Sequence, residues 1–210
     1  MKRRVFLGGV LAAALFAACG RDLPRLPALA PEAVVLAFGD SVTYGTGAAE
    51  GEDWPTQLAA LTGWVIVNAG IPGDTAQAGP ARLPALLEEY SPDLVVVEIG
   101  GNDFLRRRAR AEVKADLRRI VRMVRDSGAQ VVLVGVPELS LLSVVAGRPS
   151  DAPIYAELAD EEGVPLVPDV FSDILGRPEL CADRIHPNAA GYERMAAGIH
   201  ARLRELGLAR

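Results

Sequence analysis

A serine, an aspartate and a histidine of this chain are the residue types that nucleophilic catalysis requires. Ser41 ends the tripeptide Gly-Asp-Ser at positions 39–41, directly after a run of apolar residues. A serine hydroxyl becomes a useful nucleophile when a base removes its proton, and the usual base is a histidine oriented by a carboxylate. His186 lies three residues after Asp183 in the stretch CADRIHPNAAGY. These three side chains are therefore candidates for a Ser-His-Asp triad.

The supply of histidine narrows the choice of base. The chain contains two histidines, His186 and His200. His200 falls well inside the predicted C-terminal helix, about 20 Å further along the helix axis at 1.5 Å per residue. We therefore expect His186, and not His200, to face Ser41.

Each candidate also has a purely structural interpretation. Gly, Asp and Ser are ordinary residues of turns. Asp183 and His186 stand just before Pro187 and Asn188, a pattern that is typical of a helix start. Neither stretch alone shows whether its residues are structural or catalytic, but the occurrence of both in one chain favours catalysis.

Donors for a developing oxyanion are also available. Gly70 supplies a backbone N–H group, and Asn102 supplies a side-chain amide. Such groups stabilise the negative charge that forms on a carbonyl oxygen during acyl transfer. Without a nucleophile nearby, the same residues would be a simple turn and a turn with a helix cap. For Asp103 we predict a cap on the N–H groups of the next helix.

Five β-rich runs alternate with stretches that can form helices, and this order predicts the elements that position the site. The runs lie near residues 33–38, 64–68, 93–99, 130–136 and 164–167. We predict an α/β fold, a three-layer α/β/α sandwich with a doubly wound, mainly parallel five-stranded sheet. In such sheets the site lies at the carboxyl ends of the strands. Ser41, Gly70 and Asn102 all fall at that edge.

Two helix boundaries are also readable. Asp53 stands directly before Trp54 and Pro55, which predicts a helix capped by Asp53 with proline in its first turn. Gly128 predicts the end of a helix that precedes the fourth strand.

Four blocks of the sequence, in order, resemble the SGNH or GDSL hydrolase family, in its bacterial arylesterase and multifunctional thioesterase/lysophospholipase branch. The blocks are FGDSVTYGTG, NAGIPGDT, EIGGNDFLR and DRIHPNAAGY. The resemblance implies a flavodoxin-like SGNH hydrolase fold, with Ser41 as nucleophile and Asp183 and His186 as its partners. It also implies that the oxyanion hole consists of the Ser41 N–H, the Gly70 N–H and the Asn102 side chain.

One residue departs from the pattern of this branch. Arg184 stands between the acid and the histidine, where the branch often has glycine. This difference concerns the shape of the loop and not the triad itself.

Composition excludes several other classes of function. The net charge of −5 over 210 residues gives no sign of a nucleic-acid-binding surface. Cysteine and histidine are too scarce for a zinc cluster, and the G-x-S-x-G elbow of ordinary α/β-hydrolases is absent. We therefore expect no metal and no cofactor, and the family resemblance implies a small acyl ester or thioester as the substrate.

The first residues predict export to the bacterial cell envelope. Residues 1–18 have the basic start and apolar stretch of an export signal, and the residues up to Cys19 resemble a bacterial lipobox. We predict lipidation of Cys19, a proline-rich tether over residues 19–32 and a hydrolase domain over residues 33–210. The sequence leaves open Sec or twin-arginine export, a soluble secreted or periplasmic protein, and a disulfide between Cys19 and Cys181.

Two further groups of residues lie near the predicted site. Arg106, Arg107 and Arg108 either attract an anionic head group at the entrance or form a solvated helix start. Leucines 139, 141 and 142 follow the fourth strand and either line an acyl chain or pack under a loop. Cys181 is expected to be a small buried residue.

We conclude from the sequence that the chain is an exported serine esterase for short to medium acyl esters or thioesters. The alternative within enzymes is a carbohydrate O-acetylesterase. The alternative outside enzymes is an envelope lipoprotein that keeps the fold as a binding module.

Overall fold

Five parallel strands form one sheet in the order β2-β1-β3-β4-β5. The computed structural model describes residues 26–138 and 149–210. The strands are β1 Val34–Gly39, β2 Val65–Gly70, β3 Leu94–Glu98, β4 Gln130–Val134 and β5 Leu166–Val167. Each strand begins and ends within two residues of a predicted run, so the prediction of a five-stranded parallel sheet is confirmed.

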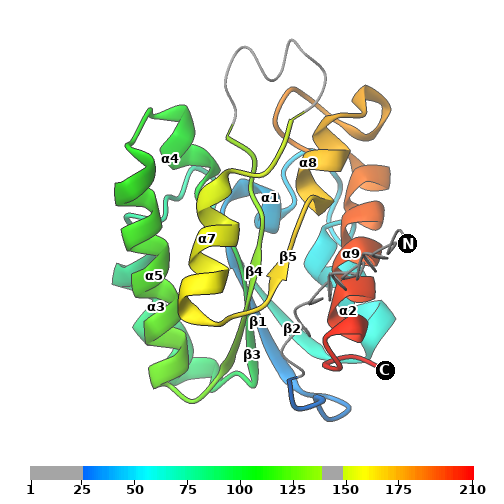
Figure 1. Ribbon diagram of the computed structural model, residues 1–210. Helices are drawn as coiled ribbons and strands as arrows, with labels where there is room; N and C mark the ends of the chain where they lie inside the picture. The colour runs from blue at the N-terminus through cyan, green and yellow to red at the C-terminus, as the bar shows by residue number, and fades with distance from the viewer. Residues whose placement is uncertain (1–25, 139–148) are drawn as a thin grey trace, which may run out of the picture.

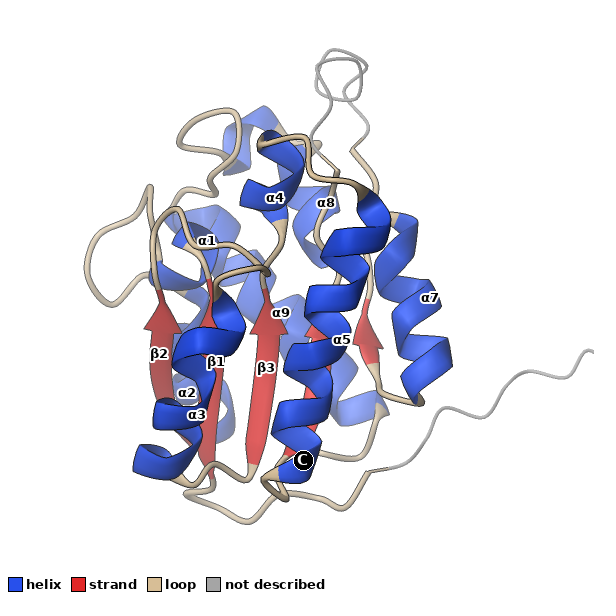
Figure 2. Cartoon of the chain, turned by 90° about the vertical axis from the view of Figure 1, so that its left-hand side faces the viewer, coloured by secondary structure: helices blue, strands red, loops and turns tan. Residues whose placement is uncertain are grey.

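Helices cover both faces of this sheet. They are α1 Ser41–Tyr44, α2 Trp54–Thr62, α3 Gly79–Tyr90, α4 Gly101–Leu105, α5 Arg110–Asp126, α7 Pro153–Glu162, α8 Val170–Leu175, α9 Ala189–Glu205 and the short 3₁₀ helix η1 Pro178–Leu180. Helices α2 and α9 pack together on one face, and α3, α5 and α7 lie on the other (Figures 1 and 2). Within residues 26–138 and 149–210, none of these helices has both the length and the apolar character that a membrane span needs. The three-layer sandwich is confirmed.

The central strands are buried because helices cover both of their faces. All five residues of β3 are buried, and so are all residues of β1 and β4 except the first of each. Helix α5 turns Val113, Leu117, Ile120, Val121 and Val124 toward the sheet, at the three- and four-residue spacing of an amphipathic helix. Burial of each such side chain stabilises the fold by about 1.5 to 3 kcal/mol.

The predicted helix boundaries agree with the structure. Asp53 caps α2, and its side chain accepts the backbone N–H of Thr56 at 2.9 Å. Helix α5 ends at Asp126, and Gly128 follows with a positive φ of 91°. A glycine adopts this left-handed conformation without steric conflict.

Part of the segment that the sequence predicts as a tether packs on the domain. The Leu26 N–H donates to Leu206 O at 3.1 Å, and the Leu29 N–H donates to Leu208 O at 3.0 Å. The Leu29 side chain is buried in the core. The described part of the predicted tether is therefore attached to the C-terminal residues.

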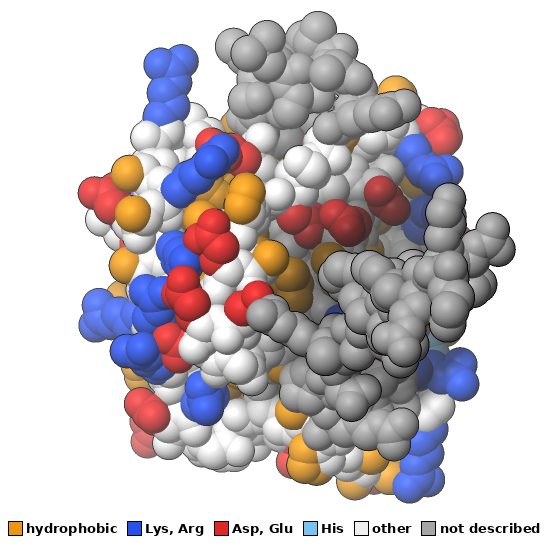
Figure 3. Space-filling view, viewed as in Figure 1, with side chains coloured by type: hydrophobic (Ala, Val, Ile, Leu, Met, Phe, Trp, Pro, Cys, Tyr) orange, Lys and Arg blue, Asp and Glu red, His pale blue; other side chains and the backbone are white. Residues whose placement is uncertain are grey.

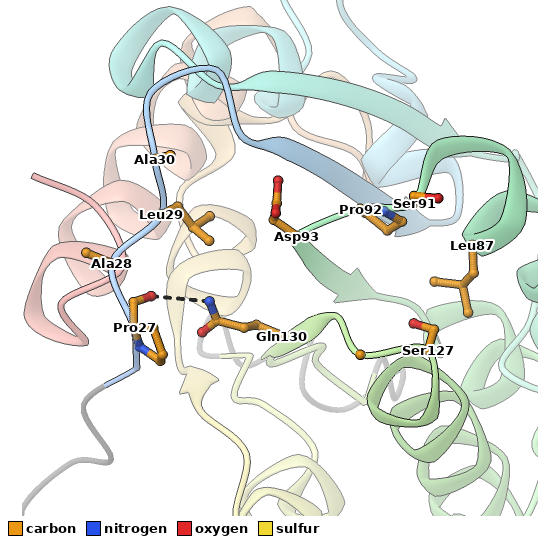
Figure 4. A pocket seen from close by; sticks show the side chains of 11 residues that line it. Pro27, Ala28, Leu29, Ala30, Leu87, Ser91, Pro92, Asp93, Ser127 and Gln130 are labelled. Atoms are coloured by element: carbon orange, nitrogen blue, oxygen red, sulfur yellow. Dashed lines mark hydrogen bonds between the residues drawn. The ribbon is translucent and has the colours of Figure 1, made fainter.

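A groove of about 540 Å³ lies beside this segment, at the edge of the sheet where the strands begin (Figure 4). Its walls include Leu29, Leu87 and Asp93, and Gln130 Nε2 donates to Pro27 O at 3.2 Å across it. None of the candidate catalytic residues lines this groove. The expected site lies at the opposite edge, where the strands end.

An ion-pair ladder joins α5 to α7. Lys114 donates to Glu157 and Glu161, each at 2.7 Å, and Arg122 donates to Glu162 at 2.9 Å. Figure 3 shows Lys and Arg side chains beside Asp and Glu side chains over these two helices. Exposed pairs of this kind contribute about 0 to 1 kcal/mol each, so apolar packing provides most of the stability of this layer.

Candidate active site

The structure brings Ser41, His186 and Asp183 together at the carboxyl end of the sheet. Ser41 is the first residue of α1, directly beyond β1. Its Oγ lies 3.0 Å from His186 Nε2, and His186 Nδ1 lies 2.8 Å from Asp183 Oδ2. These are the distances at which histidine can accept the serine proton while the carboxylate holds the imidazole in the required tautomer.

The Asp183 carboxylate is fixed by its own loop. Its Oδ1 accepts the backbone N–H groups of Ile185 at 2.8 Å and His186 at 2.9 Å. Partial burial raises the pKa of Asp183, but the bonds from the His186 ring and from these two N–H groups outweigh it and lower the pKa below its usual value. The carboxylate is therefore ionised when it orients the histidine.

The loop that contains His186 packs closely against the loop that contains Gly47, and this packing holds His186 in place. The Ala182 N–H donates to His186 O at 2.9 Å, and a Cβ atom on Gly47 would lie 2.5 Å from Pro187 O. Gly47 has a positive φ of 103°, so both space and conformation require glycine there. Arg184 is exposed and is not among the described residues with positive φ, so its replacement of a glycine causes no backbone conflict.

Gly39 and Gly70 allow α1 to pack directly on the ends of β1 and β2. A Cβ atom on Gly39 would lie 2.0 Å from Thr43 Oγ1, and one on Gly70 would lie 2.2 Å from the backbone nitrogen of Tyr44. No side chain fits at either position, because a Cβ atom this close to the neighbouring backbone would move α1. These glycines set the position of Ser41.

The Gly70 N–H already has an acceptor. It donates to Asn68 Oδ1 at 3.0 Å. This bond argues against the predicted role of Gly70 as an oxyanion donor, because an occupied donor would first have to release Asn68. Gly73 is the better candidate in this region, because its N–H has no acceptor among the described residues and it directly precedes Asp74, whose carbonyl accepts the Asn102 amide.

The Asn102 amide lies between two pieces of the site. Its Nδ2 donates to Asp74 O at 2.9 Å and to Asp40 Oδ2 at 3.2 Å. Asp40 immediately precedes Ser41, so these bonds place the amide beside the nucleophile. The bond to Asp40 is the longer of the two, and the predicted role of Asn102 as an oxyanion donor requires the amide to release one of these acceptors.

Arg82 forms hydrogen bonds that hold the turn containing Asp74. The sequence analysis did not identify this arginine as part of the site. Its guanidinium donates to Asp74 Oδ2 at 2.7 Å and to Ala69 O and Gly39 O, each at 2.9 Å. It also lies over the Phe38 ring, 3.9 Å from the ring centroid. The sequence shows an ordinary arginine in an amphipathic helix, and only the fold reveals that its three acceptors belong to three different segments.

Asp103 has different partners from those that the sequence predicts. Its Oδ2 accepts the Ala76 N–H at 2.7 Å, and its Oδ1 accepts Arg108 Nη1 at 2.6 Å. Asp103 lies inside α4 and connects it to the segment before α3, so the prediction that it caps the next helix is wrong. Arg106 donates to Gly73 O at 3.0 Å, and Arg107 is exposed.

Burial and charge act together on Asp40. Its Oδ1 accepts the Val42 N–H at 3.0 Å and so caps α1. Burial raises the pKa of Asp40 to about 6, against the effect of this backbone bond and of the nearby His186, which both lower it. Burial is therefore the largest influence on the protonation of Asp40.

The remaining candidates take no part in the triad. His200 lies on α9, where burial lowers its pKa, and Cys181 is partly buried with its Sγ 3.5 Å from Ile174 O. Leucines 139, 141 and 142 and Cys19 lie outside the described residues. No group of three or more His, Cys, Asp or Glu side chains in the described part of the chain has the arrangement of a metal site.

Comparison with known proteins identifies the family. Residues 37–194 match the GDSL-like lipase/acylhydrolase family. Esterase TesA of Pseudomonas aeruginosa is 34% identical over 180 residues, covering 82% of this chain and 88% of that protein. Thioesterase 1/protease 1/lysophospholipase L1 of Escherichia coli is 37% identical over 161 residues, covering 73% of this chain and 75% of that protein. The crystal structure of AlinE4, an SGNH-hydrolase family esterase, has a TM-score of 0.64 at 30% identity and covers 85% of this chain and 98% of its own. The chain belongs to the GDSL-like lipase/acylhydrolase family and is a carboxylic ester hydrolase.

Proposed function

We propose that this chain hydrolyses short to medium acyl esters or thioesters through a covalent acyl-enzyme. The observation that carries the proposal is the aligned series from Ser41 Oγ to His186 Nε2 at 3.0 Å and from His186 Nδ1 to Asp183 Oδ2 at 2.8 Å. The likeness to an esterase and a thioesterase supports the same chemistry.

Two steps complete the reaction. Ser41 Oγ attacks the acyl carbon while His186 takes the hydroxyl proton, and His186 then gives this proton to the leaving alcohol or thiol. Water next attacks the acyl-serine, with His186 as base, and the acid leaves as Ser41 recovers its proton. Asp183 stays ionised throughout and stabilises the imidazolium.

Three donors are available for the oxyanion that forms in each step. The Ser41 N–H lies at the start of α1, and the Asn102 amide lies beside Asp40. The third is the Gly73 N–H, which takes the place that the sequence analysis gave to Gly70. Donors of this kind act mainly in the transition state, so their loss lowers turnover more than substrate binding.

Exposed apolar side chains around the site favour an acyl substrate over an acetylated sugar. Tyr44 is 58% exposed, Ile71 47% and Leu105 45%, and they follow Ser41, Gly70 and Asn102 by only a few residues. Large apolar side chains that remain exposed beside a catalytic residue provide a surface for an acyl chain. An O-acetylesterase would need polar groups for its sugar there.

A substrate panel tests this assignment. We expect p-nitrophenyl esters from acetyl to octanoyl and medium-chain acyl-CoA to be cleaved faster than acetylated xylan. Ser41→Ala should lose turnover on every substrate. Rapid deacetylation of xylan with little cleavage of longer esters would instead support the carbohydrate O-acetylesterase, and a lack of turnover on all substrates would support a binding module.

We also propose that the protein is exported and anchored to a membrane of the cell envelope through lipidated Cys19. The support is the basic and apolar sequence that precedes this cysteine. Cys19→Ala should move the protein from the membrane fraction to the soluble fraction and leave its kinetics unchanged. An unchanged membrane fraction would contradict the anchor.

A further inference from the structure

A glutamate that the proposed mechanism does not use is buried under the nucleophile. Glu98 is the last residue of β3 and is 0% exposed. Its Oε2 accepts the Thr43 hydroxyl at 2.7 Å, whereas its Oε1 is buried and has no hydrogen-bond partner in the described part of the chain. Thr43 lies two residues after Ser41 in the single turn of α1, so Glu98 holds the helix that carries the nucleophile.

No cation compensates a charge at this position. Within residues 26–138 and 149–210, the groups that donate to the Glu98 carboxyl both belong to Thr43, its hydroxyl and its backbone N–H, and no ion pair includes Glu98. An isolated buried carboxylate is so unfavourable that such groups take up a proton instead.

A second carboxyl lies beside it. Glu98 is paired with Gly39 in the β1–β3 register, and Asp40 follows Gly39 directly. Burial is the largest cause that raises the pKa of Glu98 well above its usual value, and the charge of Asp40 is the second. The other titratable groups that Glu98 acts on are the phenols of Tyr155 on α7 and Tyr192 on α9, which carry no positive charge. His186 lies close enough to Asp40 to lower the pKa of Asp40.

We propose that Glu98 is a neutral carboxylic acid in the folded enzyme, with its proton on Oε1, and that it is a positioning residue that holds Ser41 through Thr43. Its neutrality leaves Asp40 as the single negative charge of the pair. Asp40 can then accept both the Val42 N–H and the Asn102 amide. The positioning role rests on the proposed esterase function, whereas the protonation state does not.

The pH dependence of stability tests the protonation state without any measurement of activity. The pKa of Glu98 is raised on folding, so wild-type stability is fully present below the usual carboxyl pKa of 4.5 and falls as pH rises above it. Glu98→Gln removes this titration. We therefore expect the Tm of E98Q minus the Tm of the wild type to increase by about 3 to 5 °C for each pH unit between pH 5 and 7. A difference that is constant or decreases with pH would overturn the proposal.

Glu162→Gln is a matched control with the opposite sign. The Arg122 guanidinium lowers the pKa of Glu162, so its carboxylate stabilises the fold above pH 4.5 and loses this effect as the carboxyl is protonated. We expect the Tm of E162Q minus that of the wild type to decrease as pH rises toward 4.5 and to stay constant between pH 5 and 7. This control shows that the method resolves both directions.

Kinetics test the positioning role. We expect E98Q to keep turnover within about twofold, because an amide is neutral and has the same shape as the acid. Thr43→Val should lower kcat about tenfold with KM nearly unchanged, because α1 loses its hydroxyl bond to Glu98 while the apolar surface remains. Thr62→Val, which removes a hydroxyl bonded to Leu58 O at the far end of α2, should leave kcat unchanged. A tenfold loss in E98Q, or normal turnover in T43V, would overturn the role. Loss of turnover in the wild type itself would instead contradict the proposed function.

Discussion

Helices α1 and α2 both begin with a capping aspartate, but the two caps lie in different surroundings. Asp40 caps α1 and Asp53 caps α2, each through a side-chain oxygen that accepts a backbone N–H at 3.0 Å and 2.9 Å. Helix α2 has nine residues and buries Trp54 and Leu58, so packing stabilises most of it. Helix α1 has four residues, too few to be stable without outside contacts.

The contacts that replace packing in α1 are those that form the site. Asp40 also accepts the Asn102 amide, and Thr43 donates to Glu98. Asp53 has an amide neighbour as well, Asn68, whose Nδ2 lies 3.2 Å away, but the shorter bond of this amide, 2.9 Å, goes to Thr43 O in α1. Substitutions around α1 should therefore change turnover, and substitutions around α2 should change stability.

The largest effect is expected for His186→Ala. Removal of the base leaves Ser41 with no group to take its proton, so kcat should fall on the order of a thousandfold or more. The measurement is turnover of p-nitrophenyl butyrate at pH 8, with circular dichroism to show that the fold is kept. His200→Ala is the matched control and should retain turnover. Equal losses in both variants would contradict the choice of base.

Asn102→Ala should lower kcat about a hundredfold and change KM little, because its amide contacts the oxyanion only in the transition state. Steady-state kinetics separate the two parameters. Asp103→Ala breaks the bonds to Ala76 and Arg108 and should mainly lower Tm. If Asp103→Ala abolished turnover and Asn102→Ala did not, the donor would have been assigned to the wrong residue.

Asp40→Asn should lower turnover about tenfold, because its amide cannot accept both the Val42 N–H and the Asn102 amide. Stability gives a second result with a definite sign. The pKa of Asp40 is raised from 3.8 to about 6 on folding, so wild-type stability decreases as pH rises through this range. The Tm of D40N minus that of the wild type should therefore increase between pH 4 and 6 and level off above it. The opposite trend would show that Asp40 is a stabilising carboxylate like that of a surface cap.

The smallest effect on catalysis is expected for Asp53→Ala. Loss of the α2 cap should reduce the free energy of unfolding by about 1 kcal/mol, a typical value for an N-cap, and should leave kcat within twofold of the wild type. Urea denaturation measures the first quantity. A tenfold loss of turnover in D53A would contradict the view that α1 affects turnover whereas α2 affects stability.

The sequence predicted what local patterns determine. β-rich runs located all five strands, and the scarcity of histidine selected His186, whose Nε2 lies 3.0 Å from Ser41 Oγ. Asp53 was predicted as a cap because an aspartate before Trp54 and Pro55 has a local meaning. In each case the evidence lies within a few residues of the prediction.

The sequence did not predict the contacts of Asp103 and Arg82 with distant segments. The partners of Asp103 include Ala76, which is 27 residues away, and Arg82 reaches Gly39, 43 residues away. The Gly70 N–H is bonded by Asn68 only two residues before it, but a side-chain choice of this kind does not follow from residue types. Glu98 ends an apolar strand, and nothing in its sequence shows that a second carboxyl lies next to it.

Reaction of the purified protein with a fluorophosphonate, followed by peptide mass spectrometry, tests directly whether Ser41 is the activated nucleophile. The reagent phosphonylates a serine that is activated by a base and supported by oxyanion donors. We expect one adduct, on Ser41, that disappears in Ser41→Ala and forms far more slowly in His186→Ala. An unlabelled protein, or an adduct on another residue with Ser41 unmodified, would contradict the assignment of Ser41, His186 and Asp183 as the catalytic triad.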